Sequence, residues 1–152
     1  MNLFNLADGE LEDGPEGRGF RLVRVAAGFD AKLTGLTVYE LEPGEKNWPY
    51  HFELNEEEWV ILLSGSVVVR TPDGETVLRE GDTMCFPPGP SGAHALRNDG
   101  DAVARFAMPS SIAQLGDATV YPDSNKVKVA FPGGFRRMVS LDQELDYWEG
   151  EE

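Results

Sequence analysis

The chain has 152 residues, with 13 basic and 27 acidic side chains and a formal net charge of −14. This length suits one domain with a single core, the acidic balance argues against nucleic acid as a partner, and no apolar run is long enough to span a membrane. The N-terminus has neither the basic start nor the apolar run of a signal peptide, and the single cysteine permits no internal disulfide. We therefore expect a cytoplasmic protein.

Short apolar segments separated by turn residues predict strands along most of the chain. In chain order the expected strands are 20–25, 36–41, 48–52, 58–63, 66–70, 75–78, 83–86, 93–97 and 102–108. Seventeen glycines and ten prolines supply the tight turns between them. Close spacing of short strands predicts an all-β sandwich or closed barrel.

The two ends of the chain differ from this pattern. Residues 1–19 form a short N-terminal arm, expected to be mobile because it is acidic and rich in glycine from position 7 onward. The barrel is expected over 20–110 and a C-terminal extension over 111–152. Within the extension, 120–129 looks extended with a turn, and 141–149 fits either a helical turn or a strand. Aromatic residues 147–148 predict that the extension packs on its own barrel or on a partner subunit.

The only two histidines of the chain lie within the β pattern. His51 and Glu53 are two residues apart, so on a strand they share a face. Glu58 begins the next predicted strand, and His94 comes from a separate stretch. Imidazole and carboxylate side chains that converge from separate strands form the donor set of a divalent transition metal.

These stretches resemble the two sequence motifs of the cupin family. The first has a glycine, a histidine and a glutamate followed after six residues by a glycine, and the second has Gly, Pro-x-Gly, His and Asn; the matching residues are Gly44, His51, Glu58, Gly65, Gly81, Pro87, Gly89, His94 and Asn98. Glu53 stands where the motif usually has a second histidine. The spacing from Gly89 to His94 is two residues longer than the general pattern.

A narrower resemblance is to single-domain bacterial cupins that share four phrases with this chain. They are Pro-Tyr-His, Glu-Glu-Trp, Phe-Pro-x-Gly-Pro-x-Gly-Ala-His and Tyr-Pro-Asp-Ser-x-Lys. The resemblance implies a double-stranded β-helix, the cupin jelly-roll barrel of two facing antiparallel sheets. It also implies a metal site in the barrel mouth, held by His51, Glu53, Glu58 and His94, with iron, manganese, zinc or nickel as the ion. By analogy with the family we expect a homodimer.

The expected function is a metal-binding cupin that acts on, or senses, a small organic molecule. As an enzyme it would be a dioxygenase, an isomerase or a decarboxylase, with Glu53 as the candidate catalytic group that carries a proton. Glu53 equally fits a metal ligand or a solvent-facing position at the rim. The alternatives are a metal-free ligand-binding or sensor module without catalysis, and an interaction protein that dimerises through its extension.

Three further residues have plainer interpretations. Cys85 lies in an apolar strand, so we expect a buried core residue rather than a nucleophile. Glu57 is adjacent to Glu58 and should point to the opposite side of the strand, toward solvent. Asn98 is expected to cap a hairpin turn.

Overall fold

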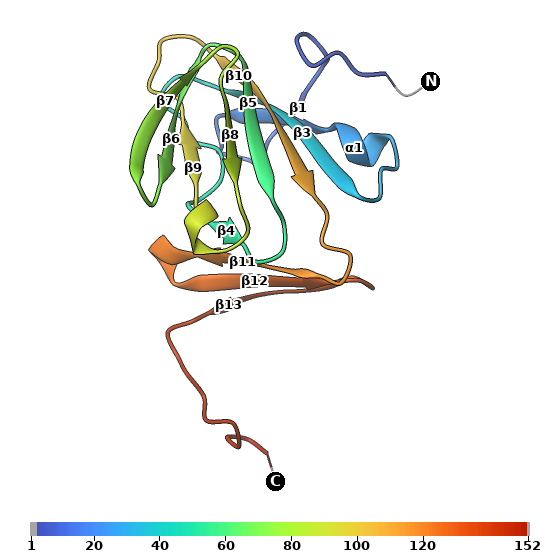
Figure 1. Ribbon diagram of the computed structural model, residues 1–152, viewed down its shortest axis with the longest axis vertical. Helices are drawn as coiled ribbons and strands as arrows, with labels where there is room; N and C mark the ends of the chain where they lie inside the picture. Colours follow the sequence, from blue (N-terminus) through green and yellow to red (C-terminus); the bar gives the residue numbers. More distant parts are fainter. Residues whose placement is uncertain (1–2, 152) are drawn as a thin grey trace.

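The computed structural model describes residues 3–151, and nearly all of its regular structure is antiparallel β (Figure 1). In chain order the strands are β1 Glu12–Asp13, β2 Phe20–Arg24, β3 Thr34–Leu41, β4 Phe52–Glu53, β5 Glu58–Ser64, β6 Ser66–Thr71, β7 Gly74–Arg79, β8 Thr83–Phe86, β9 Ala95–Arg97, β10 Ala104–Ser111, β11 Asp117–Tyr121, β12 Lys126–Phe131 and β13 Phe135–Ser140. The helical elements are α1 Val25–Gly28, η1 Pro90–Gly92 and η2 Pro122–Ser124. No helix among the described residues is long and apolar enough to cross a membrane.

Two of the three sheets enclose the main core. One has the strand order β1-β2-β3-β10-β5-β8, and the other has the order β7-β6-β9. Because alternate residues of a strand point to the same side of its sheet, the facing side chains of the two sheets merge into one apolar cluster. Its buried members include Phe20, Tyr39, Leu41, Leu62, Val69, Leu96 and Phe106. The predicted all-β jelly-roll fold is confirmed.

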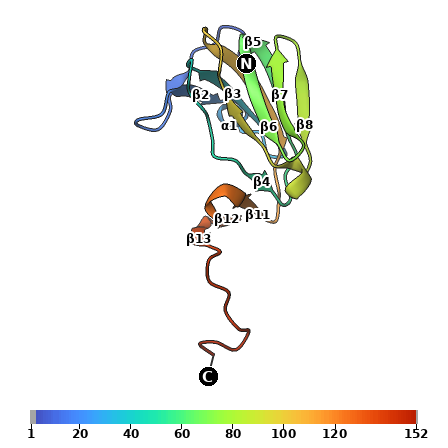
Figure 2. The ribbon, with the colours of Figure 1, turned by 90° about the vertical axis from the view of Figure 1, so that its left-hand side faces the viewer.

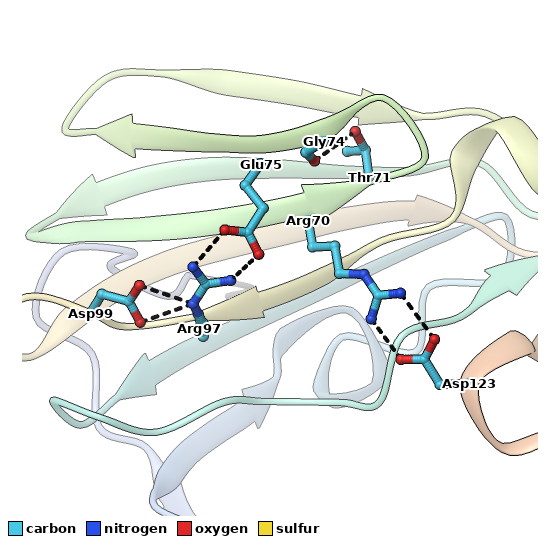
Figure 3. Close-up of polar contacts among 7 residues, drawn as sticks. All are labelled: Arg70, Thr71, Gly74, Glu75, Arg97, Asp99 and Asp123. Atoms are coloured by element: carbon cyan, nitrogen blue, oxygen red, sulfur yellow. Dashed lines mark hydrogen bonds and ion pairs between the residues drawn. The ribbon is translucent and has the colours of Figure 1, made fainter.

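The third sheet, in the order β13-β12-β11-β4, lies across one end of the two core sheets (Figures 1 and 2). Its strand β4 directly follows the bridge between His51 and His94, and within this sheet Glu53 of β4 pairs with Thr119 of β11. An ion pair adds a second connection, because Arg70 of β6 donates hydrogen bonds of 2.6 and 3.0 Å to the carboxylate of Asp123 in η2 (Figure 3). Both side chains are exposed, so this ion pair adds little to the free energy of unfolding. Its main effect is to hold η2 beside β6. We call β4 and β11–β13 the C-terminal sheet.

The N-terminal arm packs on the outer face of the six-stranded sheet, which differs from the mobile arm that the composition predicted. Leu11 is buried there in a cluster with Val38. The guanidinium of Arg105, itself buried, donates hydrogen bonds to the backbone carbonyls of Leu6 (2.8 Å) and Gly9 (2.6 Å). Sequence composition does not reveal such anchors, since every residue offers a carbonyl oxygen.

Several local predictions need correction. The strand expected over 20–25 ends at Arg24, and α1 follows it. The short apolar Val-Ala-Ala run is compatible with either a strand or a helix, so the sequence pattern did not place this boundary. The strand expected over 48–52 reduces to an isolated β-bridge at His51 followed by the two residues of β4. Strand β13 was not predicted, since two adjacent arginines interrupt its apolar pattern.

Residues 141–151 lead away from the body of the molecule as an irregular segment (Figures 1 and 2). The predicted helical turn or strand over 141–149 is absent, and 147–150 form a non-helical turn. Tyr147 and Trp148 are 82% and 72% exposed, and their ring centroids lie 4.9 Å apart. Within a single chain, these aromatic side chains therefore contact each other rather than the barrel.

Candidate functional site

A cavity of about 490 Å³ opens between the core sheets and the C-terminal sheet, and we call it the mouth cavity. Its polar lining includes one imidazole, four carboxylates, three cationic side chains and three hydroxyl groups: Arg24, Tyr39, His51, Glu53, Glu56, Glu58, Asp117, Thr119, Tyr121, Lys128 and Arg136. His94 lies directly behind this lining, only 1% exposed, with its ring centroid 4.7 Å from that of His51.

The two histidines are brought together by their own backbones. The N–H of His51 donates to the carbonyl of His94 (3.1 Å), and the N–H of His94 donates back to the carbonyl of His51 (2.8 Å). This reciprocal pair is an antiparallel β-bridge between two distant stretches of the chain. Phe86 stacks on the His94 ring at 3.8 Å between centroids, and Tyr121 stacks on the His51 ring at 5.7 Å. Both imidazoles are thus held in fixed planes.

Backbone carbonyls also orient each ring. His51 Nδ1 is 2.8 Å from the carbonyl oxygen of Pro49, and His94 Nδ1 is 2.9 Å from that of Gly92. Since a carbonyl only accepts hydrogen bonds, each Nδ1 must carry the proton and donate it. In the neutral ring the Nε2 lone pair is then free and directed at the carboxylates. A backbone acceptor on one ring nitrogen is the usual partner of a metal-ligating histidine.

Three donor groups converge at these Nε2 atoms. Potential ligand atoms of His51, Glu58 and His94 all lie within 4.8 Å of one another. Oε2 of Glu58 is 3.3 Å from His94 Nε2 and 4.0 Å from His51 Nε2. Nevertheless His94 Nε2 is buried without a hydrogen-bond partner among the described residues.

An uncharged Nε2 lone pair beside a carboxylate oxygen is repulsive unless a cation lies between them. A proton can serve this purpose at His51: burial lowers the pKa of its imidazole, but the hydrogen bond to Glu53 and the charges of Glu53 and Glu58 outweigh burial and raise that pKa. A divalent metal can serve it for both rings together. The unpartnered Nε2 of His94, with a second imidazole and a carboxylate nearby, fits a borderline divalent cation.

Glu53 lies beside this group but outside the set of three. Its Oε1 is 3.2 Å from His51 Nε2, and its side chain is only 11% exposed, so the structure does not support a solvent-facing position at the rim. Glu57, by contrast, is exposed and accepts a hydrogen bond from the indole of Trp59 at 2.9 Å, as expected for a solvent-facing neighbour of Glu58.

The remaining two expectations differ in outcome. Asn98 is fully buried and accepts a hydrogen bond from the N–H of Gly100 (2.9 Å), which agrees with the predicted turn cap. Its amide also donates to the carbonyls of Leu41 and Ala102, both at 2.8 Å. Cys85 is partly exposed rather than buried, and burial of its thiol still raises the pKa above the usual value. A raised pKa disfavours the nucleophilic thiolate.

The longer spacing before His94 has a structural role. Residues 89–92 turn sharply through η1, and Gly89 adopts φ = 89°, a conformation that favours glycine. A Cβ at Gly92 would lie 1.8 Å from the carbonyl oxygen of Pro87, so only glycine fits there. The loop thereby places the carbonyl of Gly92 against His94 Nδ1.

Several residues of the cavity were not predicted from sequence. Glu56 is half-buried, and burial raises the pKa of its carboxyl despite the hydrogen bond it accepts from the N–H of Ala113. Thr119, Lys128 and Arg136 come from the C-terminal sheet, which sequence reasoning separated from the barrel. Only the Tyr-Pro-Asp-Ser-x-Lys phrase could have signalled this region.

Comparison with known families agrees with this geometry. A model of the Cupin_2 cupin domain matches residues 37–109, which contain both histidine stretches. Residues 37–109 of this chain form a cupin domain. A search of proteins with curated functions finds no match.

Several solved structures share the fold. A sugar phosphate isomerase from a cupin superfamily of Silicibacter pomeroyi has a TM-score of 0.80 and 24% identity, covering 92% of this chain and 93% of its own. A protein named as a candidate sugar phosphate isomerase, from Acidithiobacillus ferrooxidans, has a TM-score of 0.75 and 23% identity, with coverages of 83% and 80%. A polyketide cyclase of Streptomyces resistomycificus follows at 0.60 and 21%, with coverages of 73% and 79%. At these identities the likeness establishes the fold alone.

The loop before His94 yields a testable prediction. Replacing Gly92→Ala should destabilise the protein by about 2–3 kcal/mol, because the added Cβ forces the backbone away from Pro87. Urea denaturation measures the change. Gly28→Ala is the matched control, since a Cβ there meets nothing within 4 Å and φ is not positive. Equal stability of the two variants would contradict the assigned role of Gly92.

Proposed function

We propose that this cupin is a metal-dependent isomerase of small hydroxy-carbonyl compounds of the sugar class. The observation that carries the proposal is the unpartnered Nε2 of His94, buried beside Glu58 and His51. Three protein donors would leave coordination positions open for a ligand, which is the arrangement of a catalytic rather than a structural metal site.

His51, Glu58 and His94 are the proposed metal ligands, and iron, manganese, zinc or nickel is the proposed ion. Two imidazoles and one carboxylate suit these borderline cations better than calcium, which prefers oxygen donors. A divalent ion held there supplies Lewis acidity, which polarises a carbonyl and acidifies the neighbouring C–H group. Phe86 and Tyr121 would keep the two rings in ligating orientation by packing on them.

Glu53 is the proposed proton carrier, and this role leaves it free of the metal. It would remove the proton from the carbon next to the carbonyl and return it to the former carbonyl carbon. The proton of the neighbouring hydroxyl moves to the former carbonyl oxygen, so the reaction needs no oxidant or reductant. Glu53 suits this role because it is nearly buried and lies next to the metal-ligand group.

Two similar structures that cover 83% and 92% of this chain support isomerisation over the oxygenase and decarboxylase reactions that the same donors could serve. Both carry sugar phosphate isomerase in their names, at 23% and 24% identity. The abundance of carboxylates near the histidines agrees with chemistry based on proton transfer.

Adjacent glutamates provide a sharp test of the metal site. Protein purified without chelator or histidine tag should contain near-stoichiometric metal, and Glu58→Gln should lose most of it because a carboxylate ligand is removed. Glu57→Gln removes the same charge one residue away, at an exposed position, and should keep the metal. Elemental analysis measures both variants. A metal-free wild type that takes up no added ion would instead favour the ligand-binding module without catalysis.

The role of Glu53 predicts a different result. Glu53→Gln should retain the metal but lose at least about 100-fold in kcat, since general-base catalysis contributes factors of this size. Proton NMR in D₂O, with aldoses, ketoses and their phosphates as candidate substrates, measures both turnover and deuterium incorporation at carbon. Loss of metal from Glu53→Gln would make Glu53 a ligand and refute its role as free base.

We also propose that the protein is a homodimer in which a second copy covers the outer face of the C-terminal sheet. The cross-strand pairs Val127 with Val139 and Phe131 with Phe135 lie on the side opposite the mouth cavity. Phe131, Phe135 and Val139 are 53%, 47% and 45% exposed in the single chain. Exposed apolar side chains gathered on one face are typical of an interface.

The end of the chain argues for a second copy as the occupant. Leu145, Tyr147 and Trp148 are exposed on a segment that leaves the body beside this face (Figure 1). The same segment carries acidic side chains and no basic ones, while the outer face offers the cation Arg137. In a symmetric pair, each tail can therefore supply apolar and acidic groups to the sheet of its partner.

Truncation tests this assembly. Full-length protein should be a dimer by light scattering, and deletion of residues 141–152 should convert it largely to monomer because the tails supply part of the interface. Metal content should be unchanged, since all proposed ligands precede the deleted segment. A monomeric full-length protein, or a truncated protein that remains fully dimeric, would refute the proposed role of the tail.

A further inference from the structure

Three cationic side chains line the mouth cavity from three separate strands. Arg24 ends β2, Lys128 lies in β12 and Arg136 in β13. Within residues 3–151, none of these side chains forms an ion pair or a hydrogen bond. In a chain with 27 acidic and only 13 basic residues, three unpaired cations in one cavity need a physical reason.

Strand register places two of these cations on the same face of the C-terminal sheet as Glu53. Glu53 pairs with Thr119, and Thr119 pairs in turn with Lys128, so the three side chains form one row. The neighbouring row contains Ala130 paired with Arg136.

Arg24 lies on the barrel side of the cavity, at the end of β2. It is the next residue on the inward face of β2 after Phe20 and Leu22, which both belong to the core cluster. An apolar row that ends in arginine where the cavity opens is not explained by core packing. The burial pattern of β2 supports this change, since Leu22 is buried and Arg24 is exposed.

Among residues 3–151, the carboxylates of the cavity contact other groups and form no ion pair with these cations. Glu56 accepts a hydrogen bond from the N–H of Ala113 and Asp117 accepts one from the N–H of Asn55, both at 2.9 Å. Glu53 and Glu58 face the imidazoles.

A neighbouring cavity of about 400 Å³ differs in the arrangement of its arginines. Its arginines are neutralised, because Arg70 is paired with Asp123 and Arg97 with both Glu75 and Asp99 (Figure 3). Its two lysines, Lys46 and Lys126, form no ion pair among residues 3–151, so the contrast with the mouth cavity concerns the arginines.

We propose that Arg24, Lys128 and Arg136 form an anchor for the phosphoryl group of the substrate. This inference rests on the proposed function and specifies its substrate class as phosphorylated. A phosphoryl group carries up to two negative charges and several acceptor oxygens, which guanidinium and ammonium donors bind through charge-assisted hydrogen bonds. The anchor holds one end of the substrate on the C-terminal sheet while the carbonyl end reaches His51, Glu58 and His94.

Adjacent arginines on β13 allow a matched test. Arg136 lies in the cavity lining, whereas Arg137 belongs to the opposite face and lies over the ring of Phe135 at 5.0 Å. Inorganic phosphate is titrated calorimetrically into the protein as purified, and metal content is measured on the same samples. Arg136→Gln should weaken phosphate binding about tenfold or more, since a charge-assisted hydrogen bond is lost. Arg137→Gln should change it less than about twofold, and Arg136→Lys should recover part of the affinity.

The outcomes separate the anchor from the metal chemistry. Equal phosphate affinity of Arg136→Gln and Arg137→Gln in metal-containing protein overturns the anchor and leaves the isomerase proposal standing. Selective loss in Arg136→Gln when the protein holds no metal supports the anchor and counts against the isomerase. Lys128→Gln provides an independent second variant, and it should weaken phosphate binding similarly. Unchanged affinity in Lys128→Gln would remove that residue from the anchor.

Discussion

The backbone pairing of His51 with His94 is the contact on which the site depends. Each residue both donates to and accepts from the other, so the two motif stretches cannot separate without losing two hydrogen bonds. Carbonyls two residues before each histidine then fix the Nδ1 proton, and this leaves both Nε2 atoms directed at carboxylates. Main-chain atoms hold this arrangement, and main-chain positions are less free to move than side-chain rotamers.

Burial makes the contact between the imidazole lone pairs and the carboxylates energetically unfavourable unless a cation is present. A carboxylate near a neutral imidazole lone pair would be tolerable in water, but in a low-dielectric interior the unpaired negative charge is costly. The His94 ring is almost inaccessible to solvent and is stacked on Phe86. The site therefore attracts a cation, and this physical demand is independent of which ion meets it.

The C-terminal sheet has two faces with different roles. Its inner face carries Thr119, Lys128 and Arg136 toward the mouth cavity, while its outer face carries Phe131 and Phe135. Alternation of side chains along the strands makes this possible, because neighbouring residues point to opposite sides. One sheet of four strands can therefore line a cavity with one face and expose apolar side chains on the other.

Some of this could be predicted from the sequence by itself. Short apolar runs between glycine, proline and asparagine turns determined the all-β fold, and strand 83–86 was located residue for residue. Resemblance to the cupin motifs named His51, Glu53, Glu58 and His94 as a set, and the structure groups the potential ligand atoms of His51, Glu58 and His94 without Glu53. The pairing of β4 with β11, the anchoring of the arm by Arg105 and the inward direction of Arg136 were decided only by tertiary structure. Each of these depends on contacts between segments far apart in the chain, and local sequence patterns carry no information about which distant backbone will be the partner.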